Sequence, residues 1–180
     1  MEIKNIFNEV VYEYDGSLKE TLEEFAKLNS TLSNYPINLD LSNMDLSNTN
    51  LEDIGFSGTN LEGTNLSGTN LNNAFFHNCK INESTNFIGS KIRDEILKQN
   101  PIYYNTNTQW DIMTLDEKII MGCQCHHLRT WENITDDVLR KIDENCVPDF
   151  RIWCDRVFKE AKIHQKEYLD SIGYITKDNS

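Results

Sequence analysis

Residues 41–71 read LSNMDLSNTNLEDIGFSGTNLEGTNLSGTNL, in which a large apolar residue returns at every fifth position. The period continues to residue 81, and the large residues are Leu41, Leu46, Leu51, Phe56, Leu61, Leu66, Leu71, Phe76 and Ile81. The positions two residues earlier are mostly small or medium in size, as at Thr59, Thr64 and Thr69. An α-helix repeats every 3.6 residues and a strand every two, so neither can bury this set on one face.

A coil with four flat sides can bury the set if each pentapeptide forms one side and then turns a corner. The large residue and the smaller one two before it would point inward, while the other three positions face water. Stacked coils would lie about 4.8 Å apart and pair their backbone groups. The sequence therefore predicts a mainly β fold: a right-handed quadrilateral pentapeptide-repeat β-helix over residues 38–92, with about 11 repeats in slightly under three coils.

The corners of this coil should carry residues that tolerate a left-handed backbone. Gly58, Gly63 and Gly68 each follow a large apolar residue by two positions. A positive φ is least costly for glycine, so we expect these three residues at corners.

The repeat slips by one residue after Ile81. Its large positions resume at Phe87 and Ile92, with Thr85 and Ser90 as their smaller companions. A slip of one position within an otherwise regular stack predicts a bulge or an inserted residue in 82–84.

Residues 1–37 predict a strand and a helix that cover the first coil. Val10–Tyr14 is rich in β-branched and aromatic residues, and Asp15–Gly16 is a turn signal. Ser17 and Glu20 form a capping-box pattern that opens a helix. The apolar stripe of that helix consists of Leu18, Leu22, Phe25 and Leu28. Because a short stack leaves an apolar end, we expect the helix to lie over it.

Residues 93–180 predict an α+β cap at the other end of the stack. Segments 109–113 and 118–123 are expected to be short strands around a turn at 114–117. A short helix is expected over 127–133.

Two further helices should follow. Thr135 occupies an N-cap position, and the apolar residues behind it are Val138, Leu139 and Ile142. Pro148 suits the first turn of a last helix, whose apolar face would carry Phe150, Trp153, Val157 and Ala161. The tail from Thr176 is expected to fray.

The charge and the cysteines limit the possible partners and the compartment. The net charge is −12. Nucleic-acid backbones require clustered Lys and Arg, so direct nucleic-acid binding is disfavoured and a basic partner surface is favoured. The cysteine count is odd, at 5, and the spacing is irregular, so we expect free thiols rather than a secreted disulfide framework. Neither a signal-peptide pattern nor a membrane-spanning run is evident, and we expect a soluble cytoplasmic protein.

The densest set of polar side chains lies in residues 123–131. The candidates for ligand or partner binding are Cys123, Gln124, His126, His127, Arg129 and Trp131. The pair Cys123 and Cys125 could contribute to a zinc site, but no second CxxC or HxxxH completes a tetrahedral set. A Cys–His pair could act as nucleophile and base, but no specific third group or oxyanion hole accompanies it. We therefore expect no catalytic residue, no metal and no cofactor.

Two interpretations of this cluster remain. The side chains of His126, His127, Arg129 and Trp131 could hold an anionic nucleotide through charge-assisted hydrogen bonds and stacking. Trp131 taken alone is more simply interpreted as an anchor of the core.

Several stretches resemble pentapeptide-repeat proteins carried by bacteriophages and prophages. The resemblance covers residues 1–5, the segment Val10–Glu13, the helix that opens at Ser17, and the repeat itself. The GCQ-x-H stretch from Gly122, followed by Trp131 and the segment TDD at 135–137, is similar to a C-terminal segment that often follows the repeats in that group. Cys125 and His127 fall outside this resemblance. It implies a β-helix and no general activity.

The leading functional hypothesis is a non-enzymatic inhibitor of phage type. Its rigid acidic surface would block or sequester a host protein, a defence or signalling component, in the host cytoplasm. One alternative is a small-molecule binder that sequesters a nucleotide immune signal through the His/Trp cluster or an oligomer interface. Another is a DNA mimic acting on a topoisomerase, as in the quinolone-resistance pentapeptide proteins. Aromatic residues of the tail would permit a homo-oligomer, namely Phe150, Trp153, Phe158 and Tyr168.

Overall fold

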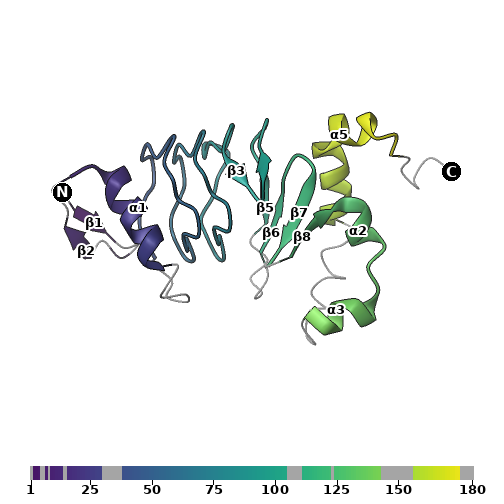
Figure 1. The fold of residues 1–180 in the computed structure, drawn as a ribbon, viewed down its shortest axis with the longest axis horizontal. Helices are drawn as coiled ribbons and strands as arrows, with labels where there is room; N and C mark the ends of the chain where they lie inside the picture. Colours follow the sequence, from purple (N-terminus) through teal and green to yellow (C-terminus); the bar gives the residue numbers. More distant parts are fainter. Residues whose placement is uncertain are drawn as a thin grey trace.

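The computed structural model forms a rod with three parts along its long axis (Figure 1). It describes residues 2–4, 7, 9–13, 16–29, 38–104, 111–122, 124–142 and 156–174. Strands β1 and β2 and helix α1 lie at one end, a coiled segment lies in the middle, and a four-stranded sheet with the C-terminal helices lies at the other end. No helix among the described residues combines the length and apolar character that a membrane span requires.

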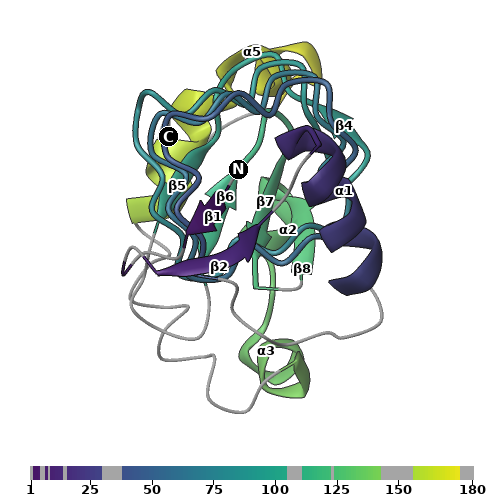
Figure 2. The same cartoon turned by 90° about the vertical axis from the view of Figure 1, so that its left-hand side faces the viewer.

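The middle part is a β-helix with four pentapeptides in each coil. Parallel bridges join residues that are 20 positions apart, which is four times five: Asp40 to Asn60, Asp45 to Asn65, Asn50 to Asn70, Gly55 to Phe75 and Asn60 to Lys80. We number the sides from first to fourth after the bridges at Asp40, Asp45, Asn50 and Gly55. Viewed along the rod, the successive coils superpose as a ring (Figure 2).

The inserted residue predicted in 82–84 is confirmed by the bridges. On the second and third sides the offset to the next coil is 21 rather than 20, because Asn65 pairs with Asn86 and Asn70 pairs with Lys91. The inserted segment forms a local turn, in which the Thr85 N–H donates to the Asn82 carbonyl oxygen at 3.0 Å. Stacking therefore continues around one extra residue.

The large apolar residues of the repeat fill the interior of the coil. Leu41, Leu46, Leu51, Phe56, Leu61, Leu66, Leu71 and Phe76 are buried. Ile81 differs from the prediction, because it is only partly buried where the insertion begins, although it packs against the same core. The rings of Phe56 and Phe76 stack with centroids 5.6 Å apart.

Buried threonines at the smaller inward positions bond to the neighbouring coil. The Thr64 hydroxyl donates to the Leu41 carbonyl at 2.7 Å, and the Thr69 hydroxyl donates to the Leu46 carbonyl at 2.9 Å. Cys79 uses the same position to donate its S–H to the Phe56 carbonyl at 3.0 Å. These bonds satisfy Thr64, Thr69 and Cys79, whereas the buried hydroxyls of Thr59 and Ser90 have no hydrogen-bond partner among the described residues.

The N-terminal part lies against the first coil. Strand β1 (Glu2–Lys4), which was not predicted, pairs with β2 (Val10–Glu13), and the Lys4 carbonyl accepts the Asp40 N–H at 2.9 Å. Helix α1 (Leu18–Asn29) opens with the predicted capping box, in which Glu20 N–H donates to Ser17 Oγ at 3.1 Å. Leu22 is buried with the coil core and Leu18 packs against it. The side chains of Phe25 and Leu28 lie outside the described part.

The C-terminal part contains two small sheets. Strands β3 (Lys91–Ile92) and β4 (Glu95–Ile96) form a hairpin. An antiparallel sheet follows with the order β5-β6-β7-β8, formed by Ile102–Tyr104, Ile112–Thr114, Lys118–Met121 and Gln124–His127. Sequence patterns missed β5 and β8. They also placed Thr114 in the turn, whereas it pairs with Ile102 in the sheet.

Helices follow the sheet. The predicted helix over 127–133 is α2 (Leu128–Glu132), and the one behind Thr135 is α3 (Asp136–Ile142). The predicted apolar face of α3 is wrong at Val138, whose exposed fraction is 46%. Of the two neighbouring residues that were predicted to be buried, it is Leu139 that is. The side chain of Ile142 is outside the described residues.

The last two helical segments pack on the hairpin loop between β6 and β7. Residues 156–164 are helical, and α5 spans Lys166–Ser171. Val157 and Ala161 are buried as predicted, whereas Pro148, Phe150, Trp153 and the tail from Thr176 lie outside the described residues. Between the two segments, buried Gln165 donates through Nε2 to the Leu115 carbonyl at 2.9 Å.

Shortening one interior leucine should destabilise the coil strongly. Leu66 is fully buried, so Leu66→Ala should lower the free energy of unfolding by about 2–5 kcal/mol through lost burial and a residual cavity. Lys80→Ala, at an exposed position on the first side, should change it by less than about 0.5 kcal/mol. Urea titration measures both values, and equal values would contradict the inward placement of Leu66.

Corner glycines should respond differently from glycines on the sides. Gly63 has φ +71°, and an added Cβ would lie 2.4 Å from Asn43 Oδ1. Gly63→Ala should therefore cost about 1–2 kcal/mol or more. Gly55 has open space around the Cβ position and no positive φ, so Gly55→Ala should be neutral or stabilise by up to about 1 kcal/mol. Thermal or urea unfolding of the two variants compares them, and a neutral Gly63→Ala would be the contrary result.

Candidate functional site

The coil ends in a tight hairpin turn at Arg93 and Asp94. Both residues have positive φ, 50° and 65°, which is the conformation of a type I′ turn that usually selects Asn-Gly. Asn72 of the coil below holds the turn, because its Nδ2 donates to Asp94 Oδ1 at 3.0 Å and its Oδ1 accepts the Asp94 N–H at 2.9 Å. The chain then runs back along β4, where Leu97 N–H donates to the Ser90 carbonyl at 3.0 Å.

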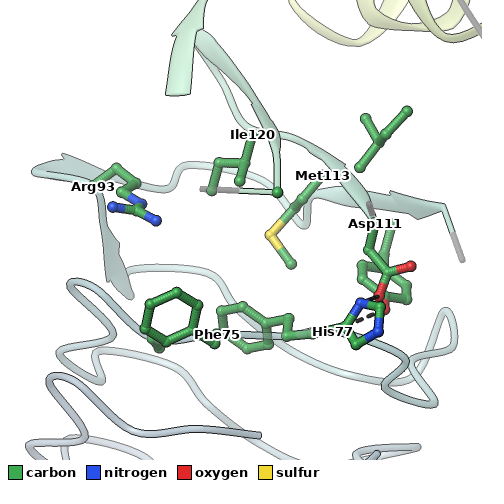
Figure 3. A pocket seen from close by; sticks show the side chains of 11 residues that line it. Phe75, His77, Arg93, Asp111, Met113 and Ile120 are labelled. Carbon is green, nitrogen blue, oxygen red and sulfur yellow. Dashed lines mark hydrogen bonds and ion pairs between the residues drawn. The ribbon is translucent and has the colours of Figure 1, made fainter. Parts of the chain in front are cut away.

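This reversal leaves room above the fourth side of the second coil. Among the described residues, Phe75 has a bridge to the coil before it and none to a coil after it. The room is a cavity of about 220 Å³ between the coil and the four-stranded sheet, which we call the junction cavity (Figure 3). It is lined by Ala74, Phe75, Phe76, His77, Arg93, Tyr103, Asp111, Ile112, Met113, Ile120 and Gly122.

Asp111 joins the sheet to the coil at one end of the cavity. Its Oδ2 accepts hydrogen bonds from the Tyr103 hydroxyl at 2.5 Å and from the Asn78 N–H, and it lies 3.6 Å from His77 Nδ1. Its Oδ1 is buried and has no hydrogen-bond partner among the described residues. The exposed fraction of the Asp111 side chain is 8%. Oδ2 therefore joins the sheet to the coil, whereas Oδ1 is unsatisfied among the described residues, as are Glu95 Oε2 and Asp116 Oδ1.

Tyr103 is a structural member of this network. Its hydroxyl accepts the Cys79 N–H at 3.1 Å and lies 2.7 Å from the Phe76 carbonyl oxygen. Burial raises the pKa of Tyr103 far above its usual range, and the Asp111 carboxylate raises it further. Burial likewise raises the pKa of the Cys79 thiol. Both groups stay protonated at neutral pH and act as donors.

Arg93 lies at the opposite end of the cavity from Asp111, with Phe75, Met113 and Ile120 between them (Figure 3). Its carbonyl oxygen accepts a hydrogen bond from Lys118 Nζ at 3.1 Å, which fixes the turn against β7. No described carboxylate forms an ion pair with its guanidinium. The cavity thus has an apolar middle, a cationic end and an anionic end.

The cluster predicted from residues 123–131 is arranged differently from the expected nucleotide pocket. Trp131, on α2, is fully buried, and its Nε1 donates to the Ile119 carbonyl at 2.9 Å. The His126 ring packs edge-on against it, with centroids 5.3 Å apart. A buried and hydrogen-bonded indole cannot stack on a ligand, so Trp131 acts as a core anchor.

The remaining members of the cluster point to separate places. His126 and His127 are consecutive in β8, so their side chains leave opposite faces of the strand. His127 stacks on Tyr168, with centroids 5.7 Å apart, while the guanidinium of Arg129 lies 4.9 Å from the Tyr174 ring centroid. Gln124 is half-buried on β8, and Cys123 lies outside the described residues. None of the described members of the cluster lines the junction cavity.

The two described cysteines are free thiols. Burial raises the pKa of Cys125, which opposes the thiolate that a nucleophile or a metal ligand requires. Within the described ranges, no three His, Cys, Asp or Glu side chains are placed to hold a metal ion.

Sequence patterns missed the cavity because its charged groups come from three separate segments. His77, Arg93 and Asp111 have no common spacing, and the hairpin that brings Arg93 over the coil has no Asn-Gly signal. The sequence of the repeat did contain one indication of the cavity. Phe75 is a large aromatic residue at an outward position that holds Asn or Asp in most other repeats.

The comparisons with known proteins support the repeat alone. A family model described as pentapeptide repeats (8 copies) matches residues 54–85, so this part of the chain consists of pentapeptide repeats. Neither the curated proteins nor the solved structures contain a significant match to the chain.

Glu95 follows directly after the turn at Arg93 and Asp94. It lies on β4, and its Oε1 accepts the Glu117 N–H at 2.5 Å, so it holds the loop between β6 and β7. Burial raises the pKa of Glu95 to about 7 from an ordinary value of 4.5, and the nearby charges of Glu117 and Asp116 add to the effect. The folded state therefore binds a proton that the unfolded state releases at lower pH.

Glu95 should make stability fall as the pH rises from about 4.5 to about 7. When the pKa of a carboxyl group is higher in the folded state, its protonation stabilises the fold fully at a pH below the unfolded-state pKa. This stabilisation is lost as the pH rises through the folded-state pKa. Glu95→Gln should remove this pH dependence. The free energy of unfolding of the variant, relative to that of the native protein, should therefore rise between pH 5 and pH 8. Urea titrations at the two pH values measure the difference, with Glu62→Gln on an exposed corner as the control. Parallel pH profiles for native protein and Glu95→Gln would refute the assignment.

Proposed function

We propose that this protein is a non-enzymatic binding protein of the inhibitor type, which recognises a partner through the fourth side of its coil around the exposed Phe75. In this proposal the coil is right-handed and quadrilateral, with about 11 repeats in slightly under three turns. The N-terminal strands and helix cap one end, and the C-terminal sheet and helices cap the other. Binding rather than thiol catalysis is supported at Cys79 and Cys125, because burial raises the pKa of both thiols and so disfavours a thiolate nucleophile.

The observation that carries the proposal is the difference between the fourth side and the other three. Outward side chains on the first three sides bond to each other along the rod: Asn60 to Asp40 at 3.2 Å, Asn65 to Asp45 at 3.1 Å and Asn70 to Asn50 at 2.9 Å. On the fourth side the corresponding residues are Gly55 and Phe75, and the exposed fraction of Phe75 is 51%. An exposed aromatic ring beside a cavity is typical of a recognition surface.

The rigidity of the coil favours this role. Each side is held by backbone bonds to the next coil, as between Leu61 N–H and the Lys80 carbonyl at 2.8 Å. A surface that is already ordered loses little conformational entropy on binding. The net charge of −12 favours a basic partner surface.

The resemblance to phage proteins supports a host defence or signalling protein as the target, met in the host cytoplasm. The DNA-mimic alternative receives less support, because the outward rows of the second coil are amides rather than carboxylates at Asn60, Asn65 and Asn70. A mimic of the phosphate backbone would need negative charge along the whole rod.

Partner binding should depend on Phe75. Phe75→Ser should abolish capture of a partner by the tagged protein, whereas Ile88→Ser should leave capture intact. Ile88 is a matched control, because its exposed fraction is 48% and it lies at the corner after the second side rather than on the fourth. Quantitative pull-down from host lysate, followed by titration of the purified partner, measures the effect. A partner retained by Phe75→Ser, or no partner at micromolar concentration, would rule out the proposed surface.

A further inference from the structure

We propose that the junction cavity is a binding site for a small aromatic molecule that carries an ammonium group at one end and a carboxylate at the other. This inference goes beyond the proposed function, because a small molecule can enter the cavity whether or not a protein partner contacts Phe75. It is argued from the size of the cavity, its walls and its two charged ends.

The size of the cavity fits a single ring. About 220 Å³ is far above the roughly 10–15 Å³ that one water needs. It is below the roughly 300–1,000 Å³ of pockets that enclose drug-sized ligands. The ligand is therefore fragment-sized, and a whole nucleotide would not be enclosed.

The walls favour an aromatic body. Phe75 and Phe76 come from the coil, while Ile112, Met113 and Ile120 come from the sheet. Aromatic side chains and a thioether contact a flat ring favourably on its face and edge. A purely polar ligand would leave these surfaces without contacts.

The anionic end requires a donor. Asp111 Oδ1 is buried without a partner in the described structure, although Oδ2 of the same carboxylate accepts from Tyr103 and Asn78. A buried acceptor that remains unsatisfied costs free energy, and of the three carboxylates with such an oxygen, those of Glu95, Asp111 and Asp116, it is Asp111 that lines the cavity. An ammonium group supplies both the missing hydrogen bond and the opposite charge.

The cationic end requires an acceptor. The guanidinium of Arg93 faces the same cavity from the other side and has no ion pair with a described carboxylate (Figure 3). Its planar donors match a carboxylate in a bidentate arrangement. Since Arg93 and Asp111 lie on opposite sides of the apolar middle, the two groups of the ligand should lie across a ring from each other.

Three probes test this arrangement. The probe 4-(aminomethyl)benzoate has both charged groups, benzylamine lacks the carboxylate, and benzoate lacks the ammonium. Protein labelled with ¹³C in its methionine methyl groups provides the readout, because Met113 lines the cavity while Met44 packs against the coil interior. We expect 4-(aminomethyl)benzoate to shift the Met113 signal saturably, to leave the Met44 signal unchanged, and to bind about tenfold or more tightly than either single-ended probe.

Two variants test which charged group of the ligand lies at Arg93 and which lies at Asp111. Arg93→Gln should weaken 4-(aminomethyl)benzoate about tenfold and leave benzylamine unchanged. Asp111→Asn should weaken benzylamine and leave benzoate unchanged. Because Asp111 also holds Tyr103, its variant could fail to fold, in which case Arg93→Gln with the three probes decides alone. Arg140→Gln, on the exposed surface of α3, is the control for lost positive charge.

The contrary results are equally definite. An unchanged Met113 signal at millimolar 4-(aminomethyl)benzoate would overturn the proposal, and so would equal affinity for all three probes. The same holds if Arg93→Gln binds every probe as the native protein does. These outcomes leave the Phe75-dependent capture of a protein partner unaffected, so the two proposals fail separately.

Discussion

The structure depends on a left-handed backbone residue at each of nine successive corners of the coil. In successive repeats this position has positive φ and is occupied by Asn38, Asn43, Asn48, Asp53, Gly58, Gly63, Gly68, Asn73 and Asn78. Asn, Asp and Gly are the residues that adopt this conformation at least cost. Because successive corners turn in the same way, backbone N–H groups along the sides, such as those of Leu61 and Asn60, meet carbonyls of the neighbouring coils. The same turn directs every fifth side chain inward. Burial and hydrogen bonding are therefore two results of one repeated conformation.

The departures from this pattern account for the rest of the molecule. The next corner would fall at Glu83, and there the chain inserts a residue before the left-handed position returns at Gly89. At Arg93 and Asp94 two consecutive residues are left-handed, which makes a hairpin instead of a corner. The coil consequently ends with its fourth side uncovered. The four-stranded sheet then approaches that side through Tyr103 and Asp111, and the junction cavity is the space that remains between them.

The sequence predicted what is periodic and missed what is not. The interior residues from Leu41 to Phe76, the corner glycines and the insertion after Ile81 follow from a five-residue period and the conformational preferences of glycine. The capping box at Ser17 is equally local. Strands β5 and β8 were missed because β5 has only three residues and β8 reads QCHH, which lacks the β-branched and aromatic residues that indicate a strand. The nucleotide pocket was expected from proximity in sequence around Trp131, whereas packing buried that indole and separated its polar neighbours. The charged ends of the junction cavity meet only through tertiary structure.

In the site that we propose, Asp111 would link the stability of the junction to the binding of a ligand. An unsatisfied buried acceptor opposes folding, and Asp111 Oδ1 shares that state with Glu95 Oε2 and Asp116 Oδ1. Here Oδ2 joins the sheet to the coil through Tyr103, while the Asp111 side chain lines the cavity and its Oδ1 has no hydrogen-bond partner among the described residues. Functional sites are where proteins retain such local conflicts. A ligand that donates to Oδ1 would complete the coordination of the same carboxylate that holds the two parts together. Its binding free energy would then add to the stability of the junction, since it binds the folded state alone.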